Sequence, residues 1–234
     1  MKPNTFVHRI TKEQIQTLPL AKFEGEVIVV DSVDQLPEAV AYLNEQKILG
    51  IDTEARPSFT RGVHYPTALL QIASEERCYL FRLTHVGMPL SLAALFANPD
   101  IRKVGLAFKD DINGLRRRQD FRPANCVDLQ SIVGRYGILD LGLQKIFAIC
   151  FGQKISKAQQ LTNWENSHLT AEQAQYASTD AWATLLIYKE LMRTQPLKKK
   201  EADALHLQDL ERQQLHQQQV LAARQQAESV NIPS

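Results

Sequence analysis

Apolar and polar positions divide the first half of the chain into short blocks with the character of β-strands. Residues 27–30 and 48–54 are mostly apolar and contain β-branched side chains, which is typical of buried strands. Residues 67–73 and 78–83 form two further runs, and the short polar segment between them predicts a β-hairpin. Apolar residues recur at helical spacing from residue 31 to residue 46. This half therefore predicts strands with one helix inserted after the first of them.

The second half of the chain alternates between strand-like and helical patterns. Residues 103–106 predict a strand, and the longest helical pattern covers residues 170–192. Strands that come early and then alternate with helices indicate an α/β fold, in which a mixed central β-sheet is flanked by helices. Shorter helical patterns are predicted over residues 90–97, 110–118, 127–133 and 141–151.

Composition divides the chain into three predicted parts. Residues 1–24 form a polar N-terminal lead-in, residues 25–195 contain every strand-like block, and residues 196–234 are rich in glutamine, alanine, leucine and charge. Apolar residues of the last part lie in loose helical register without a sustained heptad, which gives a coiled coil little support. We predict a helical or partly disordered tail, and an oligomer or protein partner bound through this tail stays open.

Four residues in two spaced pairs carry the candidate chemistry. Asp52 and Glu54 end an apolar strand, and side chains two apart on a strand point to the same face. Tyr176 and Asp180 lie four apart in the long helical pattern, so they also share a face. Either pair alone has a simpler explanation, as a surface turn or a core-edge tyrosine. Together, carboxylates that converge in a cleft need cations, and hard oxygen ligands suit Mg²⁺ or Mn²⁺. The pairs therefore predict a divalent-metal site and metal-assisted hydrolysis.

Three blocks of sequence, taken in order, resemble one known family. Residues 50–57 and 169–181 contain the two pairs, and residues 104–111 contain a strand that leads into a helix with two aspartates. These blocks resemble the DEDDy-type 3′–5′ exonucleases of the ribonuclease-H-like superfamily, as in ribonuclease D and the exonuclease domain of the Werner syndrome helicase. Residues 66–73 and the pair Asn163-Trp164 also match. The resemblance implies a ribonuclease-H-like fold for most of the chain.

The resemblance also implies a role for each matching side chain. Asp52, Glu54 and Asp180 would hold the metal that activates water, Asp52 and Asp111 would place a second metal, and Tyr176 would orient the water. Two cations, Mg²⁺ or Mn²⁺, are expected, because paired metals stabilise the attacking and leaving oxygens of a phosphodiester. The implied reaction releases nucleoside 5′-monophosphates from the free 3′ end of a nucleic acid, with DNA slightly favoured. The alternatives are RNA 3′ trimming and a non-catalytic nucleic-acid-binding scaffold.

The middle block requires a choice between two adjacent aspartates. Counting from Gly105, the family pattern places the ligand on Asp111. Asp111 shares a helix face with Leu115, whose apolar side chain should turn towards the sheet. Asp110 lies about 100° around the helix and suits an N-cap. We therefore predict that Asp111 is the metal ligand.

The sequence indicates the residues that contact substrate less clearly than it indicates the metal ligands. Arg56 and Arg61 could meet phosphates, and Arg116 or Arg117 could line the path of the strand, although an arginine run is commonly a solvated helix face. Phe59 is expected either to stack on a terminal base or to pack within its own loop.

Overall composition limits these expectations without choosing between them. The chain has 27 basic and 26 acidic residues, a net charge of +1, so binding of a polyanion must depend on local clusters. The three cysteines follow no metal or redox spacing, which suits a reducing compartment. No apolar run approaches the roughly 18 residues of a membrane helix. We expect a cytoplasmic protein that does not contact membranes.

Overall fold

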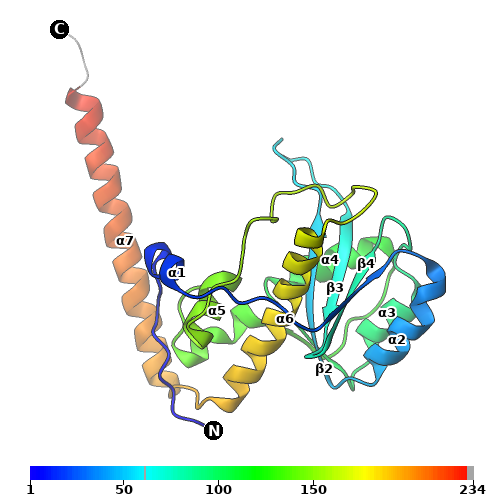
Figure 1. Cartoon of the computed structure of the whole chain (residues 1–234). Helices are drawn as coiled ribbons and strands as arrows, with labels where there is room; N and C mark the ends of the chain where they lie inside the picture. The colour runs from blue at the N-terminus through cyan, green and yellow to red at the C-terminus, as the bar shows by residue number, and fades with distance from the viewer. Residues whose placement is uncertain (61, 231–234) are drawn as a thin grey trace.

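A mixed six-stranded β-sheet forms the centre of the protein in the computed structural model, which describes residues 1–60 and 62–230 (Figure 1). The strand order is β1-β4-β3-β2-β5-β6. β3 runs antiparallel to both β2 and β4, and the other pairs are parallel. The predicted α/β class with a mixed sheet is confirmed. The strands are β1 (Glu26–Val30), β2 (Ile48–Ala55), β3 (Thr67–Ala73), β4 (Arg77–Arg82), β5 (Arg102–Gly105) and β6 (Cys126–Asp128).

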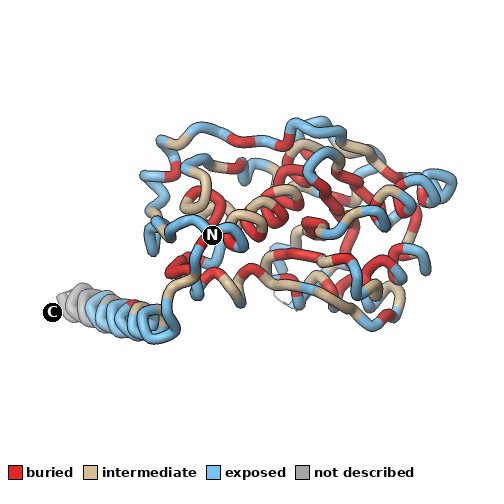
Figure 2. Tube along the Cα trace, turned by 90° about the horizontal axis from the view of Figure 1, so that it is seen from below, coloured by how far each residue is buried: buried red, intermediate tan, exposed pale blue. Residues whose placement is uncertain are grey.

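Helices cover both faces of this sheet. α2, α3 and α4 bury their apolar sides against one face in a cluster that includes Leu49 and Ile51 of β2. α5 and α6 pack over the opposite face, and α6 is buried along most of its length (Figure 2). β2 therefore has apolar side chains on one face and faces α6 with the other. The helices are α2 (Leu36–Asn44), α3 (Leu90–Ala97), α4 (Phe108–Arg118), α5 (Leu143–Phe151) and α6 (Ala171–Arg193).

One glycine fixes how closely α6 approaches the sheet. A Cβ added to Gly50 of β2 would lie 2.1 Å from the carbonyl oxygen of Ala181 and 2.9 Å from the Leu185 side chain. Real Cβ atoms do not come so close to backbone, so only glycine allows this crossing. The middle of α6 therefore crosses directly over β2 at Gly50, and Asp52 follows two residues later on the strand.

The N-terminal segment, residues 1–24, pairs with two segments from the second half of the chain. α1 (Lys12–Thr17) begins with a capping box between Thr11 and Gln14. Isolated β-bridges join Lys2 to Thr194 and Leu20 to Lys154.

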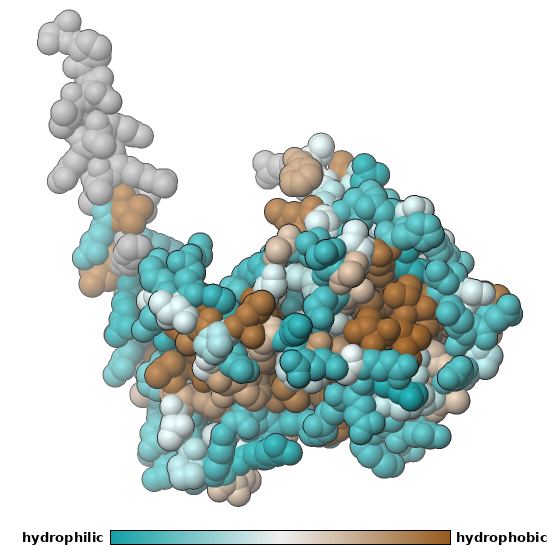
Figure 3. Space-filling model, viewed as in Figure 1, coloured by the Kyte–Doolittle hydropathy of each residue, from teal (hydrophilic) through white to brown (hydrophobic). Residues whose placement is uncertain are grey.

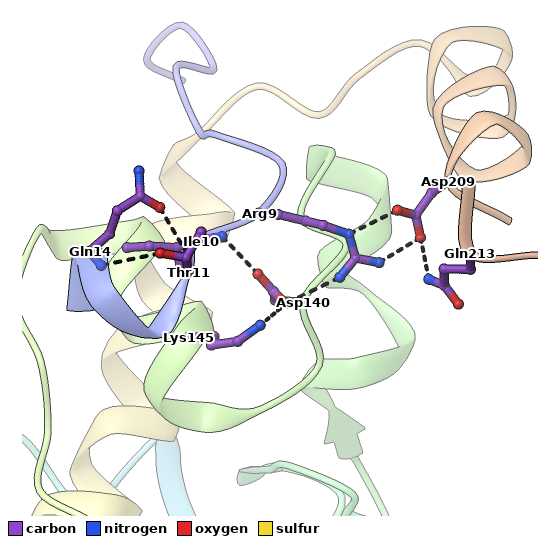
Figure 4. Close-up of polar contacts among 8 residues, drawn as sticks. All are labelled: Arg9, Ile10, Thr11, Gln14, Asp140, Lys145, Asp209 and Gln213. Carbon is purple, nitrogen blue, oxygen red and sulfur yellow. Dashed lines mark hydrogen bonds and ion pairs between the residues drawn. The ribbon is translucent and has the colours of Figure 1, made fainter. Parts of the chain in front are cut away.

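A long helix, α7 (Lys199–Val230), follows the domain and extends away from it (Figure 1). Arg9 contacts the first third of this helix at Asp209. Its Nε donates to Asp209 Oδ1 at 2.8 Å, and its Nη2 donates to Oδ2 at 2.5 Å (Figure 4). Arg9 also reaches Asp140, which accepts a second bond from Lys145 at 2.7 Å. The hydrogen bond with Arg9 keeps the pKa of Asp209 below its usual range. The N-terminal segment thus connects α7 to the loop before α5.

The described part of α7 beyond this contact is largely exposed, with separate apolar side chains along it (Figure 3). The predicted disordered end falls partly on residues 231–234, which lie outside the described residues. None of the described helices is long and apolar enough to cross a membrane.

The helix predicted over residues 127–133 is wrong. Residues 126–128 form β6, because Val127 pairs with Val104 of β5 and completes the sheet edge. Two short 3₁₀ helices, η2 (Leu129–Ser131) and η3 (Val133–Tyr136), follow.

Candidate active site

Three carboxylates converge between β2 and α6. Asp52 and Glu54 alternate with the core residue Ile51 along β2, so they face α6, and Asp180 faces them from the middle of that helix. One carboxylate oxygen from each lies within 4.8 Å of those of the other two. They line a cavity of about 310 Å³, together with Tyr176 of α6 and Lys157 of the preceding loop. The two spaced pairs from the sequence therefore meet in one cleft.

Asp111 approaches the same cleft from α4. Its Oδ1 accepts a hydrogen bond of 2.5 Å from Thr53 Oγ1, which ties the first turn of α4 to β2. It lies outside the set of three carboxylates that are mutually within 4.8 Å, but the charge of Asp52 still acts on it. Asp110 instead lines a different cavity with Arg117 and His64. Of the two adjacent aspartates, Asp111 is the one beside the cluster.

The predicted N-cap role of Asp110 is wrong, because α4 begins three residues earlier than that role requires. Ala107 precedes the helix in a left-handed conformation with φ of 52°, and Phe108 is the first helical residue. The orphan N–H groups of Ala107 and Phe108 donate to the two carboxylate oxygens of Asp128, at 3.1 and 3.0 Å. A carboxylate from β6 therefore supplies the cap that the sequence suggested for Asp110.

Burial and mutual repulsion disfavour the charged forms of these carboxyl groups. Burial, followed by the charge of Asp180, raises the pKa of Asp52 to about 8. Burial and the charges of its acidic neighbours raise the pKa of Glu54 to about 10, and similar causes raise that of Asp111 to about 8. Burial raises the pKa of Asp180 to about 7, opposed by the hydroxyl of Tyr176 and the charge of Lys157. Bound cations would reverse this balance, because they stabilise the ionised carboxylates.

Tyr176 is held with its hydroxyl protonated. Burial and the charges of Asp180 and Glu54 raise its pKa above the ordinary value of a phenol, so the group remains a hydrogen-bond donor. Its ring packs against the fully buried ring of Trp164, with ring centroids 6.0 Å apart. Gln173 completes a capping box with Thr170 at the start of α6, which orders the turn before Tyr176.

The residues predicted to contact the substrate lie in different environments. Arg56 lies 3.8 Å from Glu165 and stacks over the Tyr65 ring, with 4.9 Å from its Cζ to the ring centroid. Phe59 is 86% exposed, so the alternative in which it packs within its loop is wrong. Arg61 lies outside the described residues.

The two arginines of α4 also differ. Arg116 pairs with Asp120 at 3.0 Å on the helix surface. Arg117 lines a cavity of about 890 Å³ between α4 and residues 64–66. Arg117 is therefore the better placed of the two to meet a ligand.

Some residues of the site gave no signal in the sequence. Lys157 lies in a polar loop without helical or strand periodicity, and only the folded chain brings it to Asp180. Thr53 lies between Asp52 and Glu54 on the opposite face of β2, so its position could be foreseen but its bond to Asp111 could not.

The sequence of the chain matches one family of known proteins. Residues 27–195 match a protein family described as 3′–5′ exonuclease. The chain belongs to this family. Within it, the chain is 31% identical to a 3′–5′ exonuclease of Arabidopsis thaliana, with 78% of this chain and 69% of the relative covered. It is 28% identical to the mouse bifunctional 3′–5′ exonuclease/ATP-dependent helicase WRN, with 74% of this chain and 13% of that protein covered.

Members of the exonuclease family are often much longer than the matched region. The chain spans 13% of mouse WRN and 30% of the Drosophila melanogaster exonuclease 3′–5′ domain-containing protein 2, to which it is 32% identical over 73% of its own length.

Solved structures confirm the ribonuclease-H-like exonuclease fold. The Aedes aegypti Nibbler EXO domain superimposes with a TM-score of 0.67 at 24% identity, covering 79% of this chain and 99% of that one. Escherichia coli RNase D gives a TM-score of 0.64 at 23% identity, covering 72% and 44%.

Proposed function

We propose that this exonuclease-family protein is a metal-dependent 3′–5′ exonuclease that releases nucleoside 5′-monophosphates. The observation that carries the proposal is the convergence of Asp52, Glu54 and Asp180 within 4.8 Å in a cleft that disfavours their ionised forms. Carboxyl groups grouped in this way are costly to the fold unless cations bind them. Function therefore explains a cluster that packing alone does not.

The donor set fits hard divalent cations, because it consists of carboxylate oxygens. Asp52, Glu54 and Asp180 would hold one Mg²⁺ or Mn²⁺, and Asp52 and Asp111 would hold a second. Such cations lower the pKa of bound water and stabilise the charge on a phosphodiester under attack. The Thr53–Asp111 hydrogen bond supports this assignment, since it orients the Asp111 carboxylate relative to β2.

The protein's own groups would orient the reactants. Tyr176, kept protonated by its acidic neighbours, would donate a hydrogen bond to the attacking water and fix its direction towards phosphorus. Lys157, at the cleft wall, would offset part of the negative charge of the phosphate. Both groups act from the α6 side of the site.

The substrate would be a nucleic acid with a free 3′ end, entering past Arg56 and Phe59 on the loop after β2. An exposed aromatic ring suits stacking on a base of any identity. The cavity at Arg117 would take phosphates of the same strand farther from the cleaved bond. We propose DNA as the slightly favoured substrate, with RNA trimming as the alternative arm of the test.

The experiment compares matched 5′-labelled DNA and RNA strands, single-stranded and recessed, in Mg²⁺, Mn²⁺ or EDTA. We expect a ladder of progressively shorter products and 5′-mononucleotides in metal, and none in EDTA. Asp52→Asn is the inactive control. A folded wild-type protein that binds these strands but shortens none of them in either metal would refute the exonuclease and favour a non-catalytic scaffold.

A further inference from the structure

A buried glutamine beside the acidic cluster has an unusual environment. Gln71, in the middle of β3, has no exposed surface. Neither its Oε1 nor its Nε2 has a hydrogen-bond partner among the described residues. Burying an amide without partners costs free energy, and nearly all buried polar groups in folded proteins are paired. The partner of this buried amide must therefore be sought among the side chains that the fold places beside it.

The register of the sheet identifies the neighbour of this amide. Gln71 is directly opposite Asp52 in the antiparallel β2–β3 pair. Directly opposed residues project to the same face with Cβ atoms about 4.5–5.5 Å apart, within reach of a glutamine side chain. The partner on the other side of β3 is Leu80, which offers no polar group. The Asp52 carboxylate is thus the acceptor beside which the fold places the amide.

Packing alone would favour a different residue at this position. Leu69 and Ala73, two residues to either side on β3, face α6 as part of an apolar cluster with Leu80 and Ala177. An apolar side chain at position 71 would extend this cluster without an unpaired polar group. The amide is therefore explained by the site rather than by the core.

We infer that Gln71 is a positioning residue for Asp52, whose Nε2–H donates to the Asp52 carboxylate when that carboxylate binds a cation. The inference depends on the proposed metal-dependent function. Carboxylates that ligate metals commonly accept a hydrogen bond from a second residue, which fixes their orientation. A neutral amide does this without adding positive charge, whereas a lysine or arginine at the same place would compete with the cation.

The test measures Mn²⁺ affinity directly, from the electron paramagnetic resonance signal of free Mn²⁺, and the thermal midpoint in EDTA. Gln71→Met keeps the length of the side chain and removes the donor. We expect about tenfold weaker Mn²⁺ binding in Gln71→Met, with a thermal midpoint in EDTA no lower than that of wild type. The matched control is Tyr79→Phe, which removes a buried hydroxyl from the opposite face of the sheet and should leave Mn²⁺ affinity unchanged.

Each outcome has a defined meaning. Wild-type Mn²⁺ affinity in a folded Gln71→Met protein would overturn the inference. If Gln71→Met and a second variant, Gln71→Leu, both unfold in EDTA, the amide serves the fold and the inference is also wrong. Asp52→Asn separates the two proposals: wild-type affinity in this variant would refute the metal site itself. Loss of affinity in Asp52→Asn but not in Gln71→Met would refute only the role of Gln71.

Discussion

Asp52 should make the metal-free protein less stable as the pH rises. Its pKa is raised from 3.8 to about 8 in the fold, so the folded state holds the proton more tightly than the unfolded chain. The stabilising contribution of the protonated group is complete below pH about 4 and is lost as the pH rises towards about 8. Asp52→Asn keeps nearly the same volume and cannot ionise. The variant should therefore lose less stability than wild type over this range.

The size of this loss of stability follows from the difference between the folded and unfolded pKa values of Asp52. Between the unfolded and folded pKa values, each pH unit removes about 1.4 kcal/mol, or about 3 kcal/mol from pH 5 to pH 7 for an isolated group. Asp52 is only half-buried, so water in the cleft screens its charge. We therefore expect about half of this loss of stability, about 1.5 kcal/mol. For a chain of this length, about 1.5 kcal/mol corresponds to roughly 3–6 °C in thermal midpoint.

The assay follows thermal unfolding of wild type and Asp52→Asn by circular dichroism in EDTA at both pH values. The wild-type midpoint should fall by that margin more than the variant's. Adding MnCl₂ at the higher pH should then raise the wild-type midpoint by mass action and barely change that of Asp52→Asn.

Two results would refute the reasoning. Parallel pH curves in EDTA would show that Asp52 ionises without penalty, so the cleft would not disfavour its charge. Equal rises with Mn²⁺ in both proteins would place the bound metal elsewhere.

Three further predictions address single features of the site and its surroundings. Asp111→Asn should lower turnover about a hundredfold or more at saturating Mg²⁺, whereas Asp110→Asn should keep most activity; the reverse ranking, in single-turnover assays of folded proteins, would identify the other aspartate. Arg117→Ala should raise KM for long strands but not for dinucleotides, and Arg116→Ala, already paired on the surface, should change neither; equal KM changes on dinucleotides would contradict a distant contact. Deleting residues 202–234 should leave turnover on short substrates nearly intact, and loss of most activity in a folded truncation would show that α7 completes the site.

The parts of the fold that the sequence predicted well are those set by local periodicity. The apolar run that ends in Asp52 and Glu54 predicts a strand with both carboxylates on one face, and β2 has this arrangement. The long helical pattern with Tyr176 and Asp180 became α6. In both cases the pattern and the packing agree, because one face of each element must be buried.

The errors have one physical origin, which is contact between distant segments. The residues 127–133 have a helical pattern, yet Val127 pairs with Val104 on the sheet edge. The start of α4 is set by Asp128, so counting along the helix misplaced the cap on Asp110. Arg9 and Asp209 are at opposite ends of the chain, and no local pattern could connect them.

The site itself depends on one close crossing that local patterns do not specify. Asp52 and Asp180 lie on elements far apart in sequence, and they meet because Gly50 lets the backbone of α6 come against β2 at Ala181. The same crossing shields the carboxylates from part of the surrounding water and raises their pKa values. It also buries Gln71 beside Asp52, without a partner among the described residues. Close packing, a repelling acidic cluster and a buried amide therefore occur together at one contact. A bound cation would offset the repulsion among the carboxylates and keep Asp52 ionised as an acceptor for the amide.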